Sequence, residues 1–392
     1  MKGLGLSFIF LISTALHAQY GCTDPQAINY NAQAQLNDGS CLYSTTNTTP
    51  TLIANLSSNY TETSALVYHH DSLFSINDSG SEPILYSLDP VNGMTQHSWQ
   101  VQNATNTDWE ALASDAQHLY VGDIGNNAGT RQYLCIYTLS WDQLLVQDSI
   151  VTAVKRVFYY PDQPDSGLVF NAHPFDAEAL VYLNDSLHIF SKNWNNLWTK
   201  HYVLPCNWTD TIAAQLRDSL FVDGLITDAS SDTLSNQVYL LGYNTTGPNS
   251  YKSFMYCLWD FSPFQVFSGN KRRFELGSVL TLSQTEGLCI SGHNQGFISG
   301  EQISSVITIS PKLHHFDCSP YFSAINQNTL HLPYYFDGNW IFPSAGAQIL
   351  VTNEAGKVCF KGALKTSTYS TELLQTGCYF LEWGGKSFKF LK

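Results

Sequence analysis

Five short segments of the sequence repeat one pattern, in which an acidic residue or a substitute for it precedes a small residue and a leucine. The copies are Ser64-Ala65-Leu66, Glu110-Ala111-Leu112, Glu178-Ala179-Leu180, Asp223-Gly224-Leu225 and Glu286-Gly287-Leu288. Each copy is followed by a polar turn and a second strand-like stretch. When repeats are arranged around an axis, equivalent side chains form a ring, so the first residues of the copies are predicted to converge.

Carboxylates that converge repel one another unless they are protonated or bridged by a cation. Oxygen-only ligands favour Ca²⁺ or Mg²⁺, and no histidine or cysteine cluster accompanies the repeats to favour zinc. The predicted metal ligands are Glu110, Glu178, Asp223 and Glu286. The alternative is structural, with the carboxylates accepting hydrogen bonds from backbone amides of neighbouring repeats.

Loops rich in Asp, Asn and Gly follow the second strands and are predicted to gather at one mouth of the ring. The predicted ligand contacts there are Asp78, Asp123, Asn126, Asn127, Lys192 and Asn193. These residue types are also ordinary turn formers, which is the alternative for each of them. Glu62, Asp108 and Asp176 precede three ring positions by two residues, and strand alternation places them on the same face.

The elements that would position these residues are short strands. The second strands are predicted at residues 72–76, 118–122, 186–191, 237–243 and 296–299, and further strands follow each of them. The chain contains 22 Tyr, 22 Phe and 9 Trp, which favours strands. Repeats of four short strands are typical of propeller blades, so the predicted fold is all-β, with a five- or six-bladed β-propeller.

The remaining segments divide the chain further. Residues 1–18 combine Lys2, an apolar run and Ala18, which predicts a signal peptide. Residues 20–43 are predicted to form a small cysteine-bounded module, 44–50 a linker, 51–320 the propeller, and 325–392 a small C-terminal β-sandwich.

The formal net charge is −14, from 32 acidic and 18 basic residues, and many of the lysines lie near the C-terminus. An acidic surface repels phosphate backbones, which argues against nucleic acid as a partner. No apolar stretch after the signal is long enough to span a bilayer, so no transmembrane segment is predicted in the mature chain.

Nine cysteines occur in the chain. Cys22 and Cys41 bracket a compact polar segment and are predicted to form a disulfide, as expected of an exported protein. The others are widely spaced and no pairing is predicted for them.

Both ends resemble segments of known exported proteins. The runs Gly21-Cys22-Thr23-Asp24-Pro25 and Asn37-Asp38-Gly39-Ser40-Cys41 resemble a short repeat of secreted Bacteroidetes proteins. The strand-turn-strand pattern of 347–358, the strand of 373–381 and the basic end resemble the sorting domain of the type IX secretion system. This resemblance implies that the type IX machinery is a partner, and that the protein is secreted or attached to the outer cell surface.

The middle of the chain is similar to the SdiA-regulated and phytase-like esterase group of propellers. The similarity is carried by Glu62-Thr63-Ser64-Ala65-Leu66 and Asp108-Trp109-Glu110-Ala111-Leu112 with the loops that follow them. It implies a propeller with a Ca²⁺ site, but this group shares no single reaction.

Two functions remain open from the sequence. The first is a cation-containing binding or adhesion module for an extracellular ligand or polymer. The second is a calcium-dependent hydrolase of phosphoester or lactone type, in which Glu110 or Asp123 would be the base. No nucleophile elbow or Ser-His-Asp set is recognisable, so whether the protein is an enzyme is left open.

Overall fold

The structure is a computed structural model. It describes residues 19–392 except 147–148, 234, 246–249, 293, 305–307, 323–333, 337–338, 342–347, 366–367, 372–373, 384–385 and 392. The predicted signal peptide therefore lies outside the described residues. The chain divides into two compact units, Met1–Ile325 and Asn326–Lys392.

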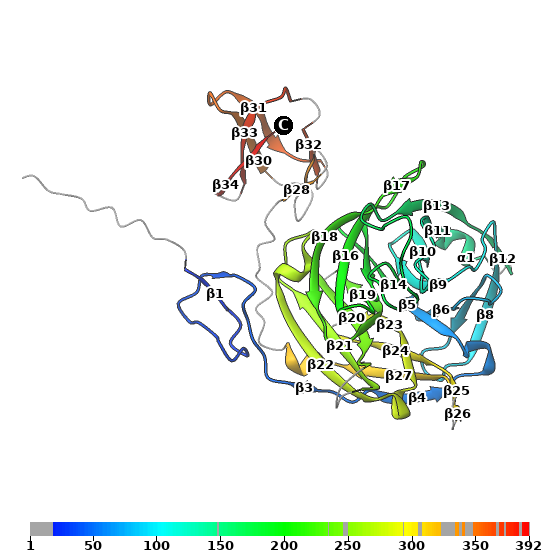
Figure 1. Ribbon diagram of the computed structural model, residues 1–392. Coiled ribbons are helices and arrows are strands. Elements are labelled where there is room, and N and C mark those ends of the chain that lie inside the picture. Colours follow the sequence, from blue (N-terminus) through cyan, green and yellow to red (C-terminus); the bar gives the residue numbers. More distant parts are fainter. Residues whose placement is uncertain are drawn as a thin grey trace, which may run out of the picture. The chain divides into compact units, whose positions relative to one another are not determined.

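Five mainly antiparallel sheets form a five-bladed β-propeller, with one strand of each sheet at the centre (Figure 1). The innermost strands are β5 (Thr63–His69), β9 (Trp109–Ser114), β14 (Ala177–Leu183), β19 (Leu225–Asp232) and β23 (Gln284–Gly292). Each packs against the next, and β23 packs against β5, which completes a circle. The sequence-based prediction of an all-β propeller is confirmed, with five blades.

The outer strands follow in order within each blade. Blade 1 continues with β6 (Ser72–Asn77), β7 (Ile84–Leu88), β8 (Thr95–Gln102) and β12 (Ile150–Thr152). Blade 2 continues with β10 (His118–Asp123), β11 (Leu134–Ser140), β13 (Val154–Tyr159) and β17 (Ile212–Ala213). Blade 3 continues with β15 (Ser186–Ser191), β16 (Trp198–Pro205) and β18 (Gln215–Phe221). The short helix α1 (Trp141–Leu144) and the single turn α2 (Val279–Leu282) lie between strands.

Blades 4 and 5 each recruit a strand from the N-terminal side of the propeller. Blade 4 consists of β19, β20 (Gln237–Tyr243), β21 (Lys252–Trp259), β22 (Asn270–Ser278) and β3 (Thr46–Asn47). Blade 5 consists of β23, β24 (Gln295–Glu301), β27 (Lys312–Asp317) and β4 (Thr51–Asn55). Because β4 pairs antiparallel with β27, a strand that precedes blade 1 in the chain completes the last blade.

Every innermost strand contains a β-bulge at the same place. The register shifts between Thr63 and Ala65 in β5, and at corresponding points of the other four strands. The bulged residues are Ser64, Glu110, Glu178, Thr227 and Glu286. A bulge re-aims side chains and is common beside functional sites. The bulge therefore explains why the first residues of four of the sequence repeats converge.

The core lies between the blades. Buried side chains of neighbouring blades form shared clusters, such as Leu66 and Leu73 of blade 1 with Cys289 and Phe297 of blade 5. Alternating apolar residues of the inner strands supply them, and their burial stabilises the circle.

The predicted Cys22–Cys41 disulfide is present, and the other described cysteines are free. In the module, β1 (Tyr20–Gly21) pairs with β2 (Leu36–Asn37). Part of the predicted linker is β3, which pairs with β22 and is thereby tied to blade 4. Asn37 also donates a 2.7 Å hydrogen bond to Asp260. The module is thus held against the propeller.

The C-terminal unit contains two sheets, as predicted for a β-sandwich. One contains β28 (Tyr334–Phe336), β29 (Asn339–Ile341) and β32 (Thr368–Ser370). The other contains β30 (Gln348–Asn353), β31 (Val358–Ala363), β33 (Cys378–Trp383) and β34 (Lys386–Leu391). Tyr369 of the first sheet packs against the core of the second, which includes Val351 and Leu381.

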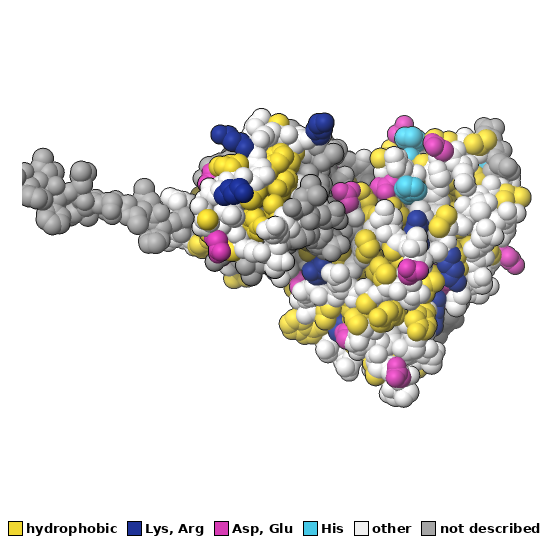
Figure 2. Space-filling model, turned by 90° about the horizontal axis from the view of Figure 1, so that it is seen from above, with side chains coloured by type: hydrophobic (Ala, Val, Ile, Leu, Met, Phe, Trp, Pro, Cys, Tyr) yellow, Lys and Arg dark blue, Asp and Glu magenta, His cyan; other side chains and the backbone are white. Residues whose placement is uncertain are grey.

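Among the described residues, no helix is both long and apolar enough to cross a membrane. On the face seen in Figure 2, acidic side chains are scattered singly among neutral ones. The closest gathering of carboxyl groups in the described structure lies at the propeller axis.

Candidate functional site

A polar cavity of about 310 Å³ opens at one end of the central channel. Four of the five bulged positions line it, namely Ser64, Glu110, Glu178 and Glu286. The remaining lining residues come from loops and strand ends: Asp78, Asn127, Lys192, Trp194, Tyr243, Gln284 and Glu301. The inner strands thus direct carboxyl groups from separate blades into one space.

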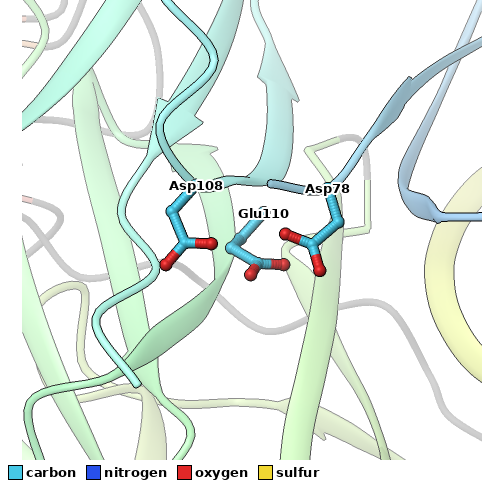
Figure 3. Close-up of side chains that lie close together, drawn as sticks. All are labelled: Asp78, Asp108 and Glu110. Carbon is cyan, nitrogen blue, oxygen red and sulfur yellow. The ribbon is translucent and has the colours of Figure 1, made fainter. Parts of the chain in front are cut away.

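Three carboxylates form the tightest acidic group in the described structure, and two of them line this cavity. Asp78 follows β6, Asp108 precedes β9, and Glu110 is the bulged residue of β9. One oxygen from each lies within 4.8 Å of the others. Figure 3 shows the three side chains hanging side by side, with Glu110 between Asp108 and Asp78. We call Asp78, Asp108 and Glu110 the acidic trio.

Among the described residues, none forms an ion pair with the acidic trio, although the charges of Arg131 and Lys192 oppose the rise in the pKa values of Asp108 and Glu110. Glu110 is 5% exposed, and its carboxylate makes no hydrogen bond to a described residue. Burial, followed by the repulsion of Glu178, holds the pKa of Glu110 well above its usual range. Burial, reinforced by Asp78 and Asp176, raises the pKa of Asp108 to about 7. The folded chain therefore favours either a proton or a cation at this place.

The opposite side of the cavity already has its own cation. The Lys192 ammonium lies 2.5 Å from Glu178 Oε2 and 3.9 Å from Glu286 Oε1. Its carbon chain and charge also face the rings of Trp194 and Tyr243, at 5.4 and 5.6 Å from the ring centroids. Lys192 thus offsets part of the charge of Glu178 and Glu286, whereas the acidic trio forms no ion pair with a described residue.

Gln284 connects two further carboxyl groups at the rim. Its amide nitrogen donates a 2.8 Å hydrogen bond to Glu286 and a second hydrogen bond to Glu301. Burial, followed by the nearby charge of Glu286, raises the pKa of Glu301 to about 9. Burial therefore favours the protonated form of this carboxyl group, in which it can donate a hydrogen bond.

Gly125 explains how the trio fits together. A Cβ at this position would lie 2.4 Å from Asp108 Cγ and 2.9 Å from Glu110 Cγ. Such contacts are far shorter than van der Waals distances, so any side chain here would displace both carboxyl groups. The glycine in the loop after β10 therefore leaves room for Asp108 and Glu110 to approach each other.

Four of the five ring residues predicted from the sequence lie at the cavity, but the residue predicted for blade 4 does not. Asp223 is exposed in the turn before β19, at φ 49°, and does not line the cavity. The equivalent bulged residue is Thr227, whose hydroxyl donates a 2.8 Å hydrogen bond to the Thr285 carbonyl. Ser64 makes the same contact to the Trp109 carbonyl, also at 2.8 Å. These two uncharged members of the ring connect neighbouring blades.

Only half of the predicted mouth contacts face the cavity. Asp78, Asn127 and Lys192 line it. Asp123 instead binds Arg131 at 2.6 Å, and Asn126 binds the Arg131 and Phe175 backbone. The Asn193 side chain closes its own turn through Asn195 and Asn196. For these three residues, the turn-forming alternative agrees with their contacts.

A regular spacing in the sequence marks several site residues that were not predicted as metal ligands. Asp108 and Gln284 each precede a bulged carboxylate by two residues, and Glu62 precedes Ser64 in the same way. Glu62 in turn contacts Glu301. Asp176, the fourth member of this series, accepts hydrogen bonds from the Asn126 amide and the Trp194 ring, and therefore supports the loops.

A buried carboxylate that the sequence pattern did not identify lies below the ring. Asp228 is fully buried and accepts hydrogen bonds from the backbone amides of Ala229 and Leu288, at 2.8 and 2.5 Å. Leu288 belongs to the neighbouring blade, so Asp228 joins two blades. Accepting hydrogen bonds from backbone amides of a neighbouring blade was the structural alternative for the ring carboxylates. In the structure, Asp228 has this role.

No protein-family model matches the chain, and no curated protein matches its sequence. Three similar solved structures are β-propellers. The PQQ-bound aldose sugar dehydrogenase of Streptomyces coelicolor has 6% identity and a TM-score of 0.41, over 69% of this chain and 98% of that chain. An exo-β-1,3-galactanase of Clostridium thermocellum has 14% identity and a TM-score of 0.43, over 83% and 78%. The calcium-binding regucalcin of Agrobacterium tumefaciens has 9% identity and a TM-score of 0.36, over 70% and 95%. Such low values carry no information about ligand or activity.

Proposed function

We propose that this protein is an exported propeller that binds one calcium ion at the acidic trio and acts as a binding module for an extracellular ligand. The observation that supports the proposal most directly is Glu110, a buried carboxylate that makes no hydrogen bond to a described residue and lies close to Asp78 and Asp108. Burying such a charge without compensation is costly, and a bound cation would remove the cost.

The residues fit calcium in type. All three are carboxylates, and hard oxygen ligands favour Ca²⁺ or Mg²⁺ over zinc or copper. They come from two loops and a bulge, an irregular set that suits the adaptable coordination of Ca²⁺ better than the octahedral demand of Mg²⁺. Once bound, the cation would offset most of the charge of the trio and offer coordination positions to ligand oxygens.

A binding role is preferred over the hydrolase alternative because neither candidate base would be free in the calcium-bound chain. Asp123 is held by Arg131 at 2.6 Å and does not line the cavity. Glu110 would be committed to the cation. The proposal therefore retains binding or adhesion and assigns no reaction.

Export is the second part of the proposal. The Cys22–Cys41 disulfide is typical of proteins that fold in an oxidising compartment. We infer that residues 1–18 are a signal peptide and that 325–392 are a type IX sorting domain of a Bacteroidetes protein. In a host with this secretion system, a chain ending at residue 325 should stay in the periplasm, whereas the full chain should be digested by protease added to intact cells. Equal location of both would contradict the sorting role.

The metal site is tested by calcium titration of the chelator-treated full chain, with metal content measured in parallel. We expect one calcium ion per chain, and an affinity at least tenfold lower in Glu110→Gln. The matched control is Glu82→Gln, which removes an exposed carboxylate outside the cavity. Absence of calcium binding in the unaltered chain, or equal binding by both variants, would refute the proposal.

A further inference from the structure

The charges around the cavity restrict what it can bind. Five carboxyl side chains line it, and Lys192 is the single basic residue among the described lining residues. Lys192 already serves Glu178 and Glu286, and a calcium ion would serve the trio. No positive charge is then left for an anionic ligand, so a phosphate or carboxylate would meet net repulsion.

A cationic ligand finds no free place either. In the described structure, the acidic trio is the only cluster of three or more side chains that could hold a metal ion, and calcium would occupy it. The other carboxylates face Lys192 or Gln284. A ligand ammonium would therefore have to displace either the calcium ion or Lys192.

The polar groups left over are neutral. The Tyr243 side chain is only 8% exposed, lines the cavity, and its hydroxyl makes no hydrogen bond to a described residue. Asn127 also lines the cavity, and burial raises the pKa of the Glu301 carboxyl group at the rim to about 9, which favours its neutral form. Neutral polar groups that face a cavity bind best to partners that both donate and accept hydrogen bonds. Hydroxyl groups do both, and oxygens of neighbouring hydroxyls can also bind calcium.

From this arrangement we propose that the cavity binds a neutral, hydroxyl-rich ligand, a saccharide without acidic or amino groups, through calcium and the Tyr243 hydroxyl. The proposal rests on the calcium site proposed above. It goes further in naming the ligand class, and it excludes phosphoesters as ligands of this cavity.

The test uses the full chain with excess calcium on an array of neutral, uronic, sulfated and amino glycans, followed by calorimetric titration of the best oligosaccharide. We expect the neutral glycans to bind best, and binding to disappear with chelator. Preference for uronic, sulfated or amino glycans would overturn the proposal. So would the absence of any glycan binding by chain that has bound calcium, an outcome that leaves the metal site intact.

Tyr243→Phe distinguishes a ligand contact from a structural role. It removes the unpaired hydroxyl and keeps the ring that faces Lys192. We expect saccharide affinity to fall about three- to tenfold, as for one neutral hydrogen bond, with calcium affinity unchanged. The control is Tyr68→Phe, whose hydroxyl binds Asp71 at the opposite end of the channel. Equal saccharide affinity in the Tyr243→Phe variant would overturn the assigned contact.

Discussion

The Lys192 ammonium lies 2.6 Å from Oε1 and 2.5 Å from Oε2 of Glu178, with both side chains almost wholly buried. Glu178 comes from the bulge of β14, and Lys192 follows β15 of the same blade. The pair divides the cavity into a side with its own cation and a side without one. The chemistry proposed for the site depends on this asymmetry.

Replacing Lys192 with Met should destabilise the propeller strongly. The change leaves Glu178 and Glu286 buried without their cation, and breaking a buried pair in this way costs about 3–5 kcal/mol. Urea unfolding monitored by tryptophan fluorescence measures the loss. The control is Lys200→Met, which breaks the more exposed pair with Asp162 and should cost about 1 kcal/mol or less. Equal losses would show that burial of Lys192 has no energetic consequence.

Gly125→Ala should weaken calcium binding. The added methyl group would collide with Asp108 and Glu110 and push their carboxyl groups apart. We expect at least a tenfold rise in the calcium dissociation constant, with a stability loss of about 1–3 kcal/mol from overpacking. Gly292→Ala is the control, because a Cβ there meets no atom within 4 Å. Unchanged calcium affinity in Gly125→Ala would exclude the trio as the binding site.

Chelator-treated protein should melt at lower temperature as the pH rises from 6.5 to 9. The pKa values of Asp108 and Glu301 are raised by burial to about 7 and about 9, so the folded chain binds their protons more tightly than the unfolded chain. Their contribution to stability is fully present below about pH 4 and is lost as the pH rises through the folded values.

Burial lowers the pKa of His314 to about 4, so its effect has the opposite sign and is complete above about pH 6.5. Differential scanning calorimetry between about pH 6.5 and 8 therefore reports mainly on the carboxyl groups, because the buried thiols, whose pKa values burial also raises, add a loss of the same sign only as the pH approaches 9. Excess calcium should reduce the slope, because the cation replaces the proton at Asp108. A melting temperature that does not change with pH in the chelated protein would contradict the raised pKa values.

Asp228→Ala should be far more damaging than Asp223→Ala. Asp228 holds two backbone amides in the interior, and leaving them unpaired costs roughly 3 kcal/mol or more. Asp223 is exposed in a turn, so its change should stay within about 1 kcal/mol. Chemical denaturation of the two variants provides the comparison. A larger effect at Asp223 would restore the ring assignment made from the sequence pattern.

The contrast between Asp223 and Thr227 shows how far the sequence could lead. Strand positions followed from alternation and turn residues, and the second strand Ser186–Ser191 was predicted at its observed bounds. The bulge adds one residue to each inner strand, and its position in blade 4 cannot be recognised from an acidic-small-leucine triplet. The triplet at Asp223 matched the pattern by composition while the bulged residue lay further along the chain.

The acidic trio depends on contacts between blades that no local pattern specifies. Glu110 was selected as a ligand and Asp108 as part of the lining, whereas Asp78 was assigned to the mouth. The approach of these three follows from the packing of β5 against β9 and from the missing side chain of Gly125. Similarly, the commitment of Asp123 to Arg131 depends on how the loop folds back after β10.

The pairing of β4 with β27 has a consequence for the order of events during synthesis. Residues 51–55 leave the ribosome first, yet their partners at 312–317 emerge only after every blade has been made. The circle therefore cannot close on a partly synthesised chain, and its non-local pairing favours slow folding. A chain of this topology closes its circle only when both strands lie on the same side of any membrane that the chain crosses.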